Sequence, residues 1–372
     1  MRVLAAIVAM LVSFAAPAMA RDRIEIVDLA GRTVRVPAKV ERVVLGEGRL
    51  VPVLGIFDRD DPVRRVVGMM GEFELLDPAG YAQYLQRFPA IARVPRIGRS
   101  SSDSFSVEKA IALQADVAIF GVEGHGPSSR AKELIAQLEA AGTVIVFVDF
   151  RQKPLTNTRR SIEILGQVLG RQKEAADFLA FYDSQLAIVT TRLAGVSRKP
   201  SVFLESRVGL NEQCCETMVA GMMGDFVAAA GGANIARGIV PGAHGTVSNE
   251  YLLQHQPAVY IGTAIGAAST AGKMPTRIVL GAGVSADVAR ASLERATKRT
   301  GIAELDAVRQ GRAFAIWHHF YNTPLHVAAI QAIARWLHPA LFADVDPRAT
   351  LRVLFERHQA VPLDGAYWIE AR

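Results

Sequence analysis

The feature that most limits the fold is a long central stretch with no strand pattern. From Leu155 to Ala194 the sequence has no proline, and Gly170 is its natural break. Beyond that glycine, apolar residues recur every three or four positions, the spacing of one helix face: Ala175, Leu179, Tyr182, Leu186, Val189 and Leu193. A helix of about 25 residues spans roughly 37 Å, which is long for a helix inside one α/β domain. We therefore predict a rigid strut between two domains.

Short strands rich in valine and isoleucine alternate with helices on both sides of this stretch. Such alternation is typical of parallel sheets covered by helices on both faces. The sequence predicts strands at 43–45, 117–120, 144–148, 202–204, 259–261 and 313–317, and helices at 107–113, 131–141, 218–230, 286–298 and 327–337. A small hairpin turned at Gly31 is expected before them.

The fold class that we predict is therefore α/β. Two doubly wound lobes, at 21–154 and 197–372, are joined by a single long rigid helix within 155–196, and a ligand cleft lies between the lobes.

The first twenty residues have the order of a secretory signal. Arg2 precedes an apolar run, Ala18-Met19-Ala20 forms a small-x-small cleavage site, and charged residues begin at Arg21. The apolar run is too short to span a bilayer. No cysteine follows the cleavage site. We expect residues 1–20 to be removed on export, leaving a soluble protein without a lipid anchor.

Charge and composition exclude several classes of function. The net charge is +6, from 42 basic and 36 acidic residues without blocks of like charge. This distribution argues against nucleic-acid binding and allows an anionic ligand. Two adjacent cysteines, Cys214 and Cys215, form no disulfide framework, and the sequence leaves open whether they are bridged to each other. Walker, G-x-S-x-G and H-E-x-x-H motifs are absent, so we expect no enzyme activity and no cofactor.

An internal repeat supports two lobes of similar design. Segments 106–119 and 248–261 share Ser, Glu, Gln, Val and Ile in one ungapped register. In each copy a serine suited to an N-cap precedes a short helix, and a glutamate in the first turn suits the helix dipole. These glutamates are Glu108 and Glu250. A strand follows each helix, and one copy lies on each side of the long central stretch.

The sequence resembles a known family, the periplasmic binding proteins of ABC importers for iron-siderophores, haem and cobalamin. The similarity runs through the mature chain, in DLAGRTVRVP…ERVV, SVEKAIALQADVAIFG, SNEYLLQHQPAVYIGT, AAGGANIA and FYNTPLHVAAIQAIARWLHPALFADVDP. The last segment is similar to the ferric-chelate branch. The resemblance implies a periplasmic protein that carries a ferric-siderophore-type chelate to the permease subunits of the inner membrane. It also implies that Glu108 and Glu250 dock against permease arginines, and we expect a monomer.

Ligands of open α/β sheets bind beyond the carboxyl ends of the strands. Arginine suits carboxylate or catecholate oxygens because its planar fork donates two bonds at once, and tyrosine can donate a hydrogen bond or stack on a ring. The residues predicted to border the cleft are Glu47, Arg49, Arg99, Glu205, Arg207, His244, His319 and Tyr321. This set favours an anionic ferric chelate.

Direct capture of a bare manganese, zinc or iron ion is the alternative. It requires three or four His, Asp or Glu ligands around one ion. The residues that would supply them are His125, Glu205, His244 and His319. Haem and cobalamin remain further alternatives for the same cleft. The chelate branch is preferred because the sequence resembles it more closely.

Overall fold

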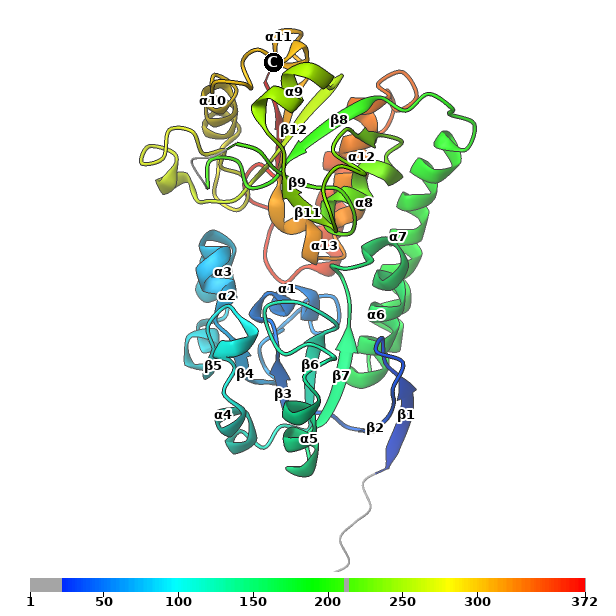
Figure 1. Ribbon diagram of the computed structural model, residues 1–372. Helices are drawn as coiled ribbons and strands as arrows, with labels where there is room; N and C mark the ends of the chain where they lie inside the picture. The colour runs from blue at the N-terminus through cyan, green and yellow to red at the C-terminus, as the bar shows by residue number, and fades with distance from the viewer. Residues whose placement is uncertain (1–21, 211–213, 372) are drawn as a thin grey trace, which may run out of the picture.

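The computed structural model describes residues 22–210 and 214–371, so the predicted signal at 1–20 lies outside the described residues. The described chain forms two α/β lobes, one above the other in Figure 1, and the colours show that the first is built from the N-terminal half. Among these residues, no helix has both the length and the apolar character needed to cross a membrane.

The N-terminal lobe is built around a sheet whose order is β5-β4-β3-β6-β7, and all neighbouring strands are parallel. Its strands are β3 (Val43–Leu45), β4 (Val66–Met70), β5 (Arg96–Gly98), β6 (Val117–Gly121) and β7 (Val144–Val148). Its helices are α1 (Val51–Leu54), α2 (Glu72–Leu76), α3 (Pro78–Arg87), α4 (Val107–Ala112) and α5 (Lys132–Ala140). The predicted hairpin is confirmed as β1 (Arg23–Val27) and β2 (Thr33–Pro37), with Gly31 at φ 76° in its turn.

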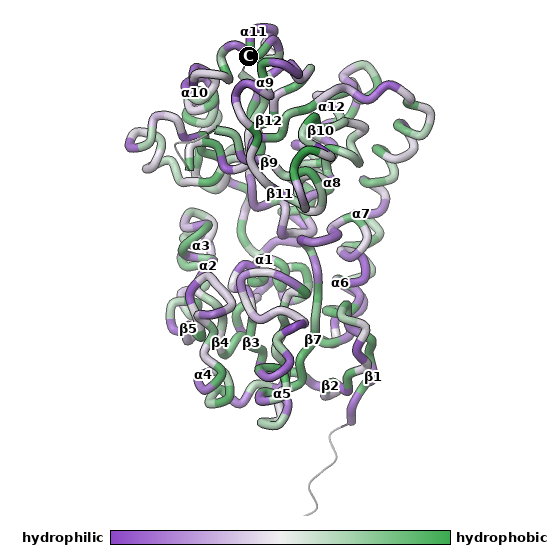
Figure 2. The backbone as a smooth tube through the Cα atoms, viewed as in Figure 1, coloured by the Kyte–Doolittle hydropathy of each residue, from purple (hydrophilic) through white to green (hydrophobic). Residues whose placement is uncertain are grey.

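The C-terminal lobe has a mixed sheet of order β11-β9-β8-β12-β13-β14, with β10 beside β8. Its strands are β8 (Ser201–Glu205), β9 (Glu216–Met218), β10 (Ala233–Asn234), β11 (His244–Thr246), β12 (Val259–Ala264), β13 (Ala313–Trp317) and β14 (Trp368–Glu370). Its helices are α8 (Met222–Ala229), α9 (Asn249–His255), α10 (Ala286–Ala296), α11 (Asp306–Arg309), α12 (His326–Leu337) and α13 (Pro347–His358). The central strands β8, β12 and β13 are parallel. Figure 2 shows strands in both sheets, such as β7 and β12, as hydrophobic, as expected of strands buried on both faces.

Two helices connect the lobes, α6 (Pro154–Leu169) and α7 (Gln172–Leu193). Gly170 ends α6 in the left-handed conformation, at φ 65°, which glycine adopts without strain. The long helix expected beyond that glycine is α7, which runs along one side of both lobes (Figure 1). Arg171 pairs with Asp58 of the N-terminal lobe at 2.9 Å, and Tyr182 bonds His326 of α12 at 2.8 Å. The connection is thus fixed to each lobe by a buried or partly buried contact.

The internal repeat corresponds to equivalent structure in the two lobes. Ser106 and Ser248 cap helices α4 and α9, each accepting a backbone N–H bond of 3.2 Å. The matched residues Gln114 and Gln256 both have positive φ, at 46° and 39°, where each chain leaves its helix. Strands β6 and β12 then begin. The same local design is therefore used once per lobe.

One predicted helix begins later than expected. The apolar residues of segment 218–230 predict a helix over its whole length. In the structure Met218 ends strand β9, and α8 begins at Met222. Between them Gly221 has φ 60°, a left-handed turn that separates strand from helix. Strand β9 matters for function because it borders the space between the lobes.

Candidate ligand-binding site

A cavity of about 430 Å³ lies between the two lobes, beyond the carboxyl ends of their parallel strands. Its size is within the roughly 300–1,000 Å³ common for small-molecule sites. The N-terminal lobe contributes Leu75, Leu76, Pro78, His125 and Arg151. The C-terminal lobe contributes Ser206, Arg207, Leu210, Glu216, Met218, Met222, His244, Ile265, Gly266, Ala267, Thr270, Arg277, His318, His319 and Tyr321. The expected cleft between the lobes is present.

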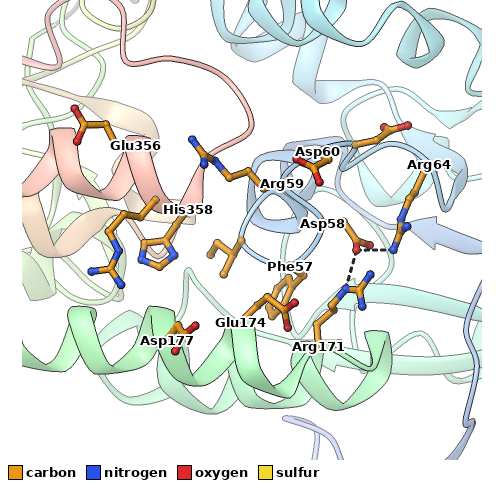
Figure 3. A pocket seen from close by; sticks show the side chains of 13 residues that line it. Phe57, Asp58, Arg59, Asp60, Arg64, Arg171, Glu174, Asp177, Glu356 and His358 are labelled. Atoms are coloured by element: carbon orange, nitrogen blue, oxygen red, sulfur yellow. Dashed lines mark hydrogen bonds and ion pairs between the residues drawn. The ribbon is translucent and has the colours of Figure 1, made fainter.

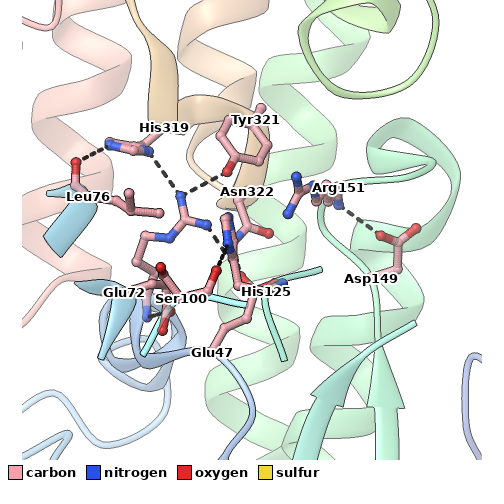
Figure 4. Close-up of polar contacts among 11 residues, drawn as sticks. Glu47, Glu72, Leu76, Ser100, His125, Asp149, Arg151, His319, Tyr321 and Asn322 are labelled. Atoms are coloured by element: carbon pink, nitrogen blue, oxygen red, sulfur yellow. Dashed lines mark hydrogen bonds and ion pairs between the residues drawn. The ribbon is translucent and has the colours of Figure 1, made fainter. Parts of the chain in front are cut away.

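Arg49 joins the two lobes behind this cavity. Its Nη1 donates to the Tyr321 hydroxyl at 2.9 Å and lies 3.0 Å from His319 Nδ1, while Nη2 is 3.6 Å from Glu47 Oε2 (Figure 4). The side-chain amide of Asn322, from the C-terminal lobe, donates a second hydrogen bond across the lobes, to Glu47 Oε2 at 2.6 Å. Arg49 is buried and does not line the cavity. Its observed role is to hold Tyr321 and His319 against the N-terminal lobe.

The contacts of His319 define its protonation state. Arg49 cannot accept a hydrogen bond, so Nδ1 of His319 is the acceptor and Nε2 carries the proton, which it donates to the Leu76 carbonyl at 2.9 Å. Burial, followed by the charge of Arg49, lowers the pKa of His319 to about 3. The ring is therefore neutral near pH 7, and both of its nitrogens are engaged.

Two glutamates of the N-terminal lobe lie beside Arg49 and differ in their ionisation. Burial tends to raise the pKa of Glu47, but Arg49, Arg151 and His125 outweigh it and hold that pKa below its usual value. Burial, followed by the negative charge of Glu47, raises the pKa of Glu72 to about 7. Glu72 Oε1 accepts the backbone N–H of Arg49 at 2.9 Å. The negative charge beside Arg49 is thus carried mainly by Glu47.

The glycine-rich loop after β6 packs against Glu47. The backbone N–H of His125 donates to Glu47 Oε1 at 3.0 Å. A Cβ at Gly124 would lie 1.9 Å from the same oxygen, and a Cβ at Gly126 would lie 2.1 Å from the Gly46 carbonyl oxygen. Gly124 therefore allows the loop to approach the protein's own Glu47, and Gly126 allows it to approach the Gly46 backbone.

Arg151 follows strand β7 and points into the cavity beneath Tyr321. Its guanidinium carbon is 5.1 Å from the centre of the Tyr321 ring, and the Asp149 carboxylate accepts its backbone N–H at 2.9 Å (Figure 4). Its Nε and Nη1 are buried and have no hydrogen-bond partner within the described part of the chain. Its backbone carbonyl accepts the N–H of Met222 from the other lobe at 2.9 Å. Arg151 is also one of the residues that line the cavity.

Arg207 and Glu216 form the corresponding charged pair on the C-terminal lobe. Arg207 Nη2 is 2.5 and 2.7 Å from the two Glu216 oxygens, and both residues line the cavity. His318 also lines it, and its Nδ1 is hydrogen-bonded to the Thr263 hydroxyl, with 2.9 Å between Nδ1 and Oγ1. Burial, followed by the neighbouring His319, lowers the pKa of His318 well below its usual value. His244 lines the cavity from β11 and is exposed.

Besides Glu47 and Arg49, which lie behind the cavity and do not line it, two predicted residues lie elsewhere. Glu205 is buried inside the C-terminal lobe, where Arg299 donates to it at 2.6 and 2.7 Å and the Tyr260 hydroxyl also donates to it. The last side chain of β8 thus faces its own lobe and not the cavity. Arg99 is exposed and does not line the cavity either. The expected placement of both at the cleft is corrected.

The alternative metal site does not assemble in the structure. Among the residues that the structure describes, His125, Glu205, His244 and His319 do not form a ligand group. The grouping found there is Glu205 with Cys214 and Cys215. These cysteines are joined to each other by a disulfide, and the carboxylate is paired with Arg299. Neither thiolate nor free carboxylate is available for an ion.

A second hollow, of about 650 Å³, opens beside α7 and α13. Figure 3 shows its charged lining, in which Asp58 bonds Arg64 at 2.6 Å and Arg171 at 2.9 Å. Acidic and basic side chains alternate around it, and the connecting helix forms one wall. It lies away from the carboxyl ends of the strands, so the interlobe cavity is the stronger candidate for ligand binding.

Several residues of the site are absent from the predicted set, Glu216 and Arg277 among them, and three others show why. Arg151 follows strand β7, which was predicted correctly. The expectation that ligand-binding residues follow the carboxyl ends of strands, which identified Arg49, applies to Arg151 as well. Glu72 follows β4, a strand that the sequence analysis did not identify. Asn322 carried no signal of its own, because its partner Glu47 is 275 residues away in the sequence.

Comparisons with known proteins agree with this architecture. A family model described as periplasmic binding protein matches residues 86–316. Among curated proteins, none matches the sequence.

Three solved structures illustrate the similarity. The TroA-like periplasmic binding protein FepB from Veillonella parvula is 25% identical, with a TM-score of 0.82 over 94% of this chain and 100% of that one. The molybdate-bound protein MolA from Haemophilus influenzae is 18% identical, with a TM-score of 0.66 over 92% and 99%. The periplasmic heme-binding protein RhuT from Roseiflexus is 19% identical, with a TM-score of 0.55 over 81% and 99%. With the two-lobe fold and the family match over residues 86–316, this chain belongs to the periplasmic binding protein family.

Proposed function

We propose that this protein captures an anionic ferric chelate of the siderophore type in the interlobe cavity and delivers it to an ABC permease of the inner membrane. The observation that carries the proposal is the charge of the cavity. Among the described residues that line it, three are arginines, Arg151, Arg207 and Arg277, and one is a carboxylate, Glu216. A cavity of this charge attracts an anion more strongly than a bare cation.

Arg151 is the strongest anchor for the ligand. Its Nε and Nη1 are buried and, among the described residues, have no protein acceptor. A buried donor without a partner is costly, at about 1–3 kcal/mol. A carboxylate or catecholate oxygen from a ligand would accept a charge-assisted hydrogen bond from this guanidinium. Arg207 lies across the cavity and can share its charge between Glu216 and the ligand.

The similar structures do not fix the cargo, since their names include molybdate in one case and heme in another. Bare metal is disfavoured because His319 uses both ring nitrogens within the protein. We therefore keep the ferric chelate as the proposed cargo and treat haem, cobalamin and bare ions as the competing results of the test.

Delivery would use the two glutamates of the internal repeat. Glu108 and Glu250 are exposed on the first turns of α4 and α9, one on each lobe. The Ser106 hydroxyl donates to Glu108 at 3.1 Å. Two carboxylates on lobes joined by α6 and α7 would give a two-point electrostatic register for a permease.

The proposal is tested by a thermal-shift and native mass-spectrometry screen of the exported protein. The panel contains ferric citrate, a ferric hydroxamate, a ferric catecholate, haem, cobalamin, Mn²⁺ and Zn²⁺. A ligand at a hundred times its dissociation constant stabilises by about 2.7 kcal/mol. We expect a ferric chelate to bind one to one, and Arg151→Ala to weaken it at least tenfold while Arg99→Ala leaves it unchanged. Stabilisation by Mn²⁺ or Zn²⁺ alone would contradict the proposal.

A further inference from the structure

Apolar residues line the interlobe cavity together with its arginines. Six of them, which we call the apolar wall, are Leu75, Leu76, Pro78, Leu210, Ile265 and Ala267. Its first three residues form the junction between α2 and α3. Its last two directly follow strand β12. In Figure 1 helices α2 and α3 stand below the loop that follows β12, so the apolar wall is formed by both lobes.

Both halves of the apolar wall are held in place by hydrogen bonds. The Leu76 carbonyl accepts from His319 Nε2 at 2.9 Å, which ties the end of α2 to the opposite lobe. On that lobe the Ile265 carbonyl accepts from Arg277 Nε at 2.9 Å. The apolar surface therefore has a fixed position relative to the arginines of the same cavity.

Two members of the apolar wall are exposed, Leu75 and Pro78, and Leu75 is the large hydrophobic one. It is 48% exposed although it lines a cavity beside other apolar side chains. Removing such a surface from water is favourable in proportion to its apolar area. An occupant that continues from the arginines of the cavity along the apolar wall would cover it.

We infer that the ligand is amphiphilic, with its anionic donor groups toward Arg151 and Arg207 and an alkyl or aryl arm along the apolar wall. Leu75 is then a specificity-determining residue for that arm. This inference rests on the proposed function, because it takes the interlobe cavity as the binding site. It goes beyond that function because it predicts tighter binding of chelates that carry an apolar substituent than of small hydrophilic chelates such as ferric citrate.

The test compares two ferric complexes that share a donor set and a charge. They are formed by a hexadentate tris-catecholamide chelator with and without a butyl substituent, and dissociation constants are measured by tryptophan fluorescence quenching. The variants are Leu75→Ser and the matched control Leu85→Ser. Leu85 is 37% exposed on α3 and lies outside the cavity lining. Because both leucines are exposed, neither change is expected to disturb folding.

We expect the wild-type protein and Leu85→Ser to prefer the butyl complex at least fivefold. Leu75→Ser should reduce that preference to less than twofold and leave the affinity for the unsubstituted complex within twofold of wild type. Equal affinity of the wild type for both complexes, or a preference untouched by Leu75→Ser, would overturn the inference while leaving the proposed function intact. Failure of both complexes to bind would overturn the inference, and only failure of every ferric chelate in the screening panel would contradict the proposed function itself.

Discussion

Arg49 of the N-terminal lobe donates a hydrogen bond of 2.9 Å to the hydroxyl of Tyr321 in the C-terminal lobe. The guanidinium carbon is also 5.4 Å from the centre of the Tyr321 ring. Both residues are buried, so this contact is a structural junction between lobes. Tyr321 in turn lines the cavity and lies over Arg151. The junction therefore positions one wall of the candidate binding site.

Replacing Arg49 should destabilise the protein as well as the site. Arg49→Met leaves Glu47 short of one positive partner and removes the donor to Tyr321 and His319. Breaking a buried charge pair by removing one partner costs about 3–5 kcal/mol. We expect a loss of about 3 kcal/mol in the free energy of unfolding, measured in urea. The exposed control Arg99→Met should change it by less than about 0.5 kcal/mol, and an Arg49→Met loss equally small would contradict the role of the junction.

Substitutions of the two members of the Arg207–Glu216 pair should change the affinity for an anionic chelate in opposite directions. Arg207→Ala removes a lining charge and should weaken an anionic chelate several-fold. Glu216→Gln removes the lining carboxylate and releases Arg207, so the same chelate should bind more tightly. Both constants are measured by fluorescence titration at low and moderate salt. Weakening by both variants would show that the pair acts as a structural unit and that neither residue attracts the ligand.

Stability should fall in acid because buried histidines are held neutral. His326 accepts from the Tyr182 hydroxyl at Nε2 and lies 2.8 Å from the Thr323 carbonyl at Nδ1. Burial lowers its pKa to about 4, against an ordinary value of 6.5. Between these values the unfolded chain binds one more proton than the folded chain. His326 alone therefore removes about 1.4 kcal/mol per pH unit as the pH falls through this window.

The check for this prediction is urea unfolding at intervals from pH 6.5 to 4. His326→Gln removes the titrating group and retains polar atoms. The slope of its unfolding free energy against pH should therefore be smaller than that of the wild type by the contribution of one proton, about 1.4 kcal/mol per pH unit. Parallel pH profiles for the two proteins would contradict the assignment. The absolute stability of the variant does not matter to this comparison, because only the slopes are compared.

Docking should be separable from ligand binding. Glu108→Arg and Glu250→Arg reverse exposed charges on α4 and α9, away from the cavity. We expect either variant to bind the chelate as the wild type does but to reduce permease-dependent uptake into proteoliposomes at least tenfold. Glu133, in the first turn of α5, offers a matched control at another exposed helix start. Uptake that is insensitive to both reversals would refute docking through these residues.

The sequence predicts the architecture well and the side-chain contacts poorly. Strands 144–148 and 313–317 have the predicted bounds because they are continuous apolar runs, and the helix beyond Gly170 has a clear period. Strand β5, Arg96–Gly98, has a single large apolar side chain, Ile97, and so lacks the apolar run that identified the equally short β3.

At the candidate site, too, the sequence predicted which segments lie near the cavity better than it predicted which side chains face it. The strand-end rule located Arg207, His319 and Tyr321 at the cavity. It could not tell that Arg49 is buried in the junction or that Glu205 faces Arg299 inside its own lobe. Those outcomes depend on which way a side chain turns and on partners that are distant in sequence.

The most direct test of the account is anomalous diffraction at the iron edge from crystals of the protein with a bound ferric catecholate. The account predicts one iron peak in the interlobe cavity, between Arg151 and Arg207, with ligand oxygens in contact with Arg151 Nε and Nη1. An iron peak in the hollow beside α7, or an iron ion held directly by histidine nitrogens, would contradict it.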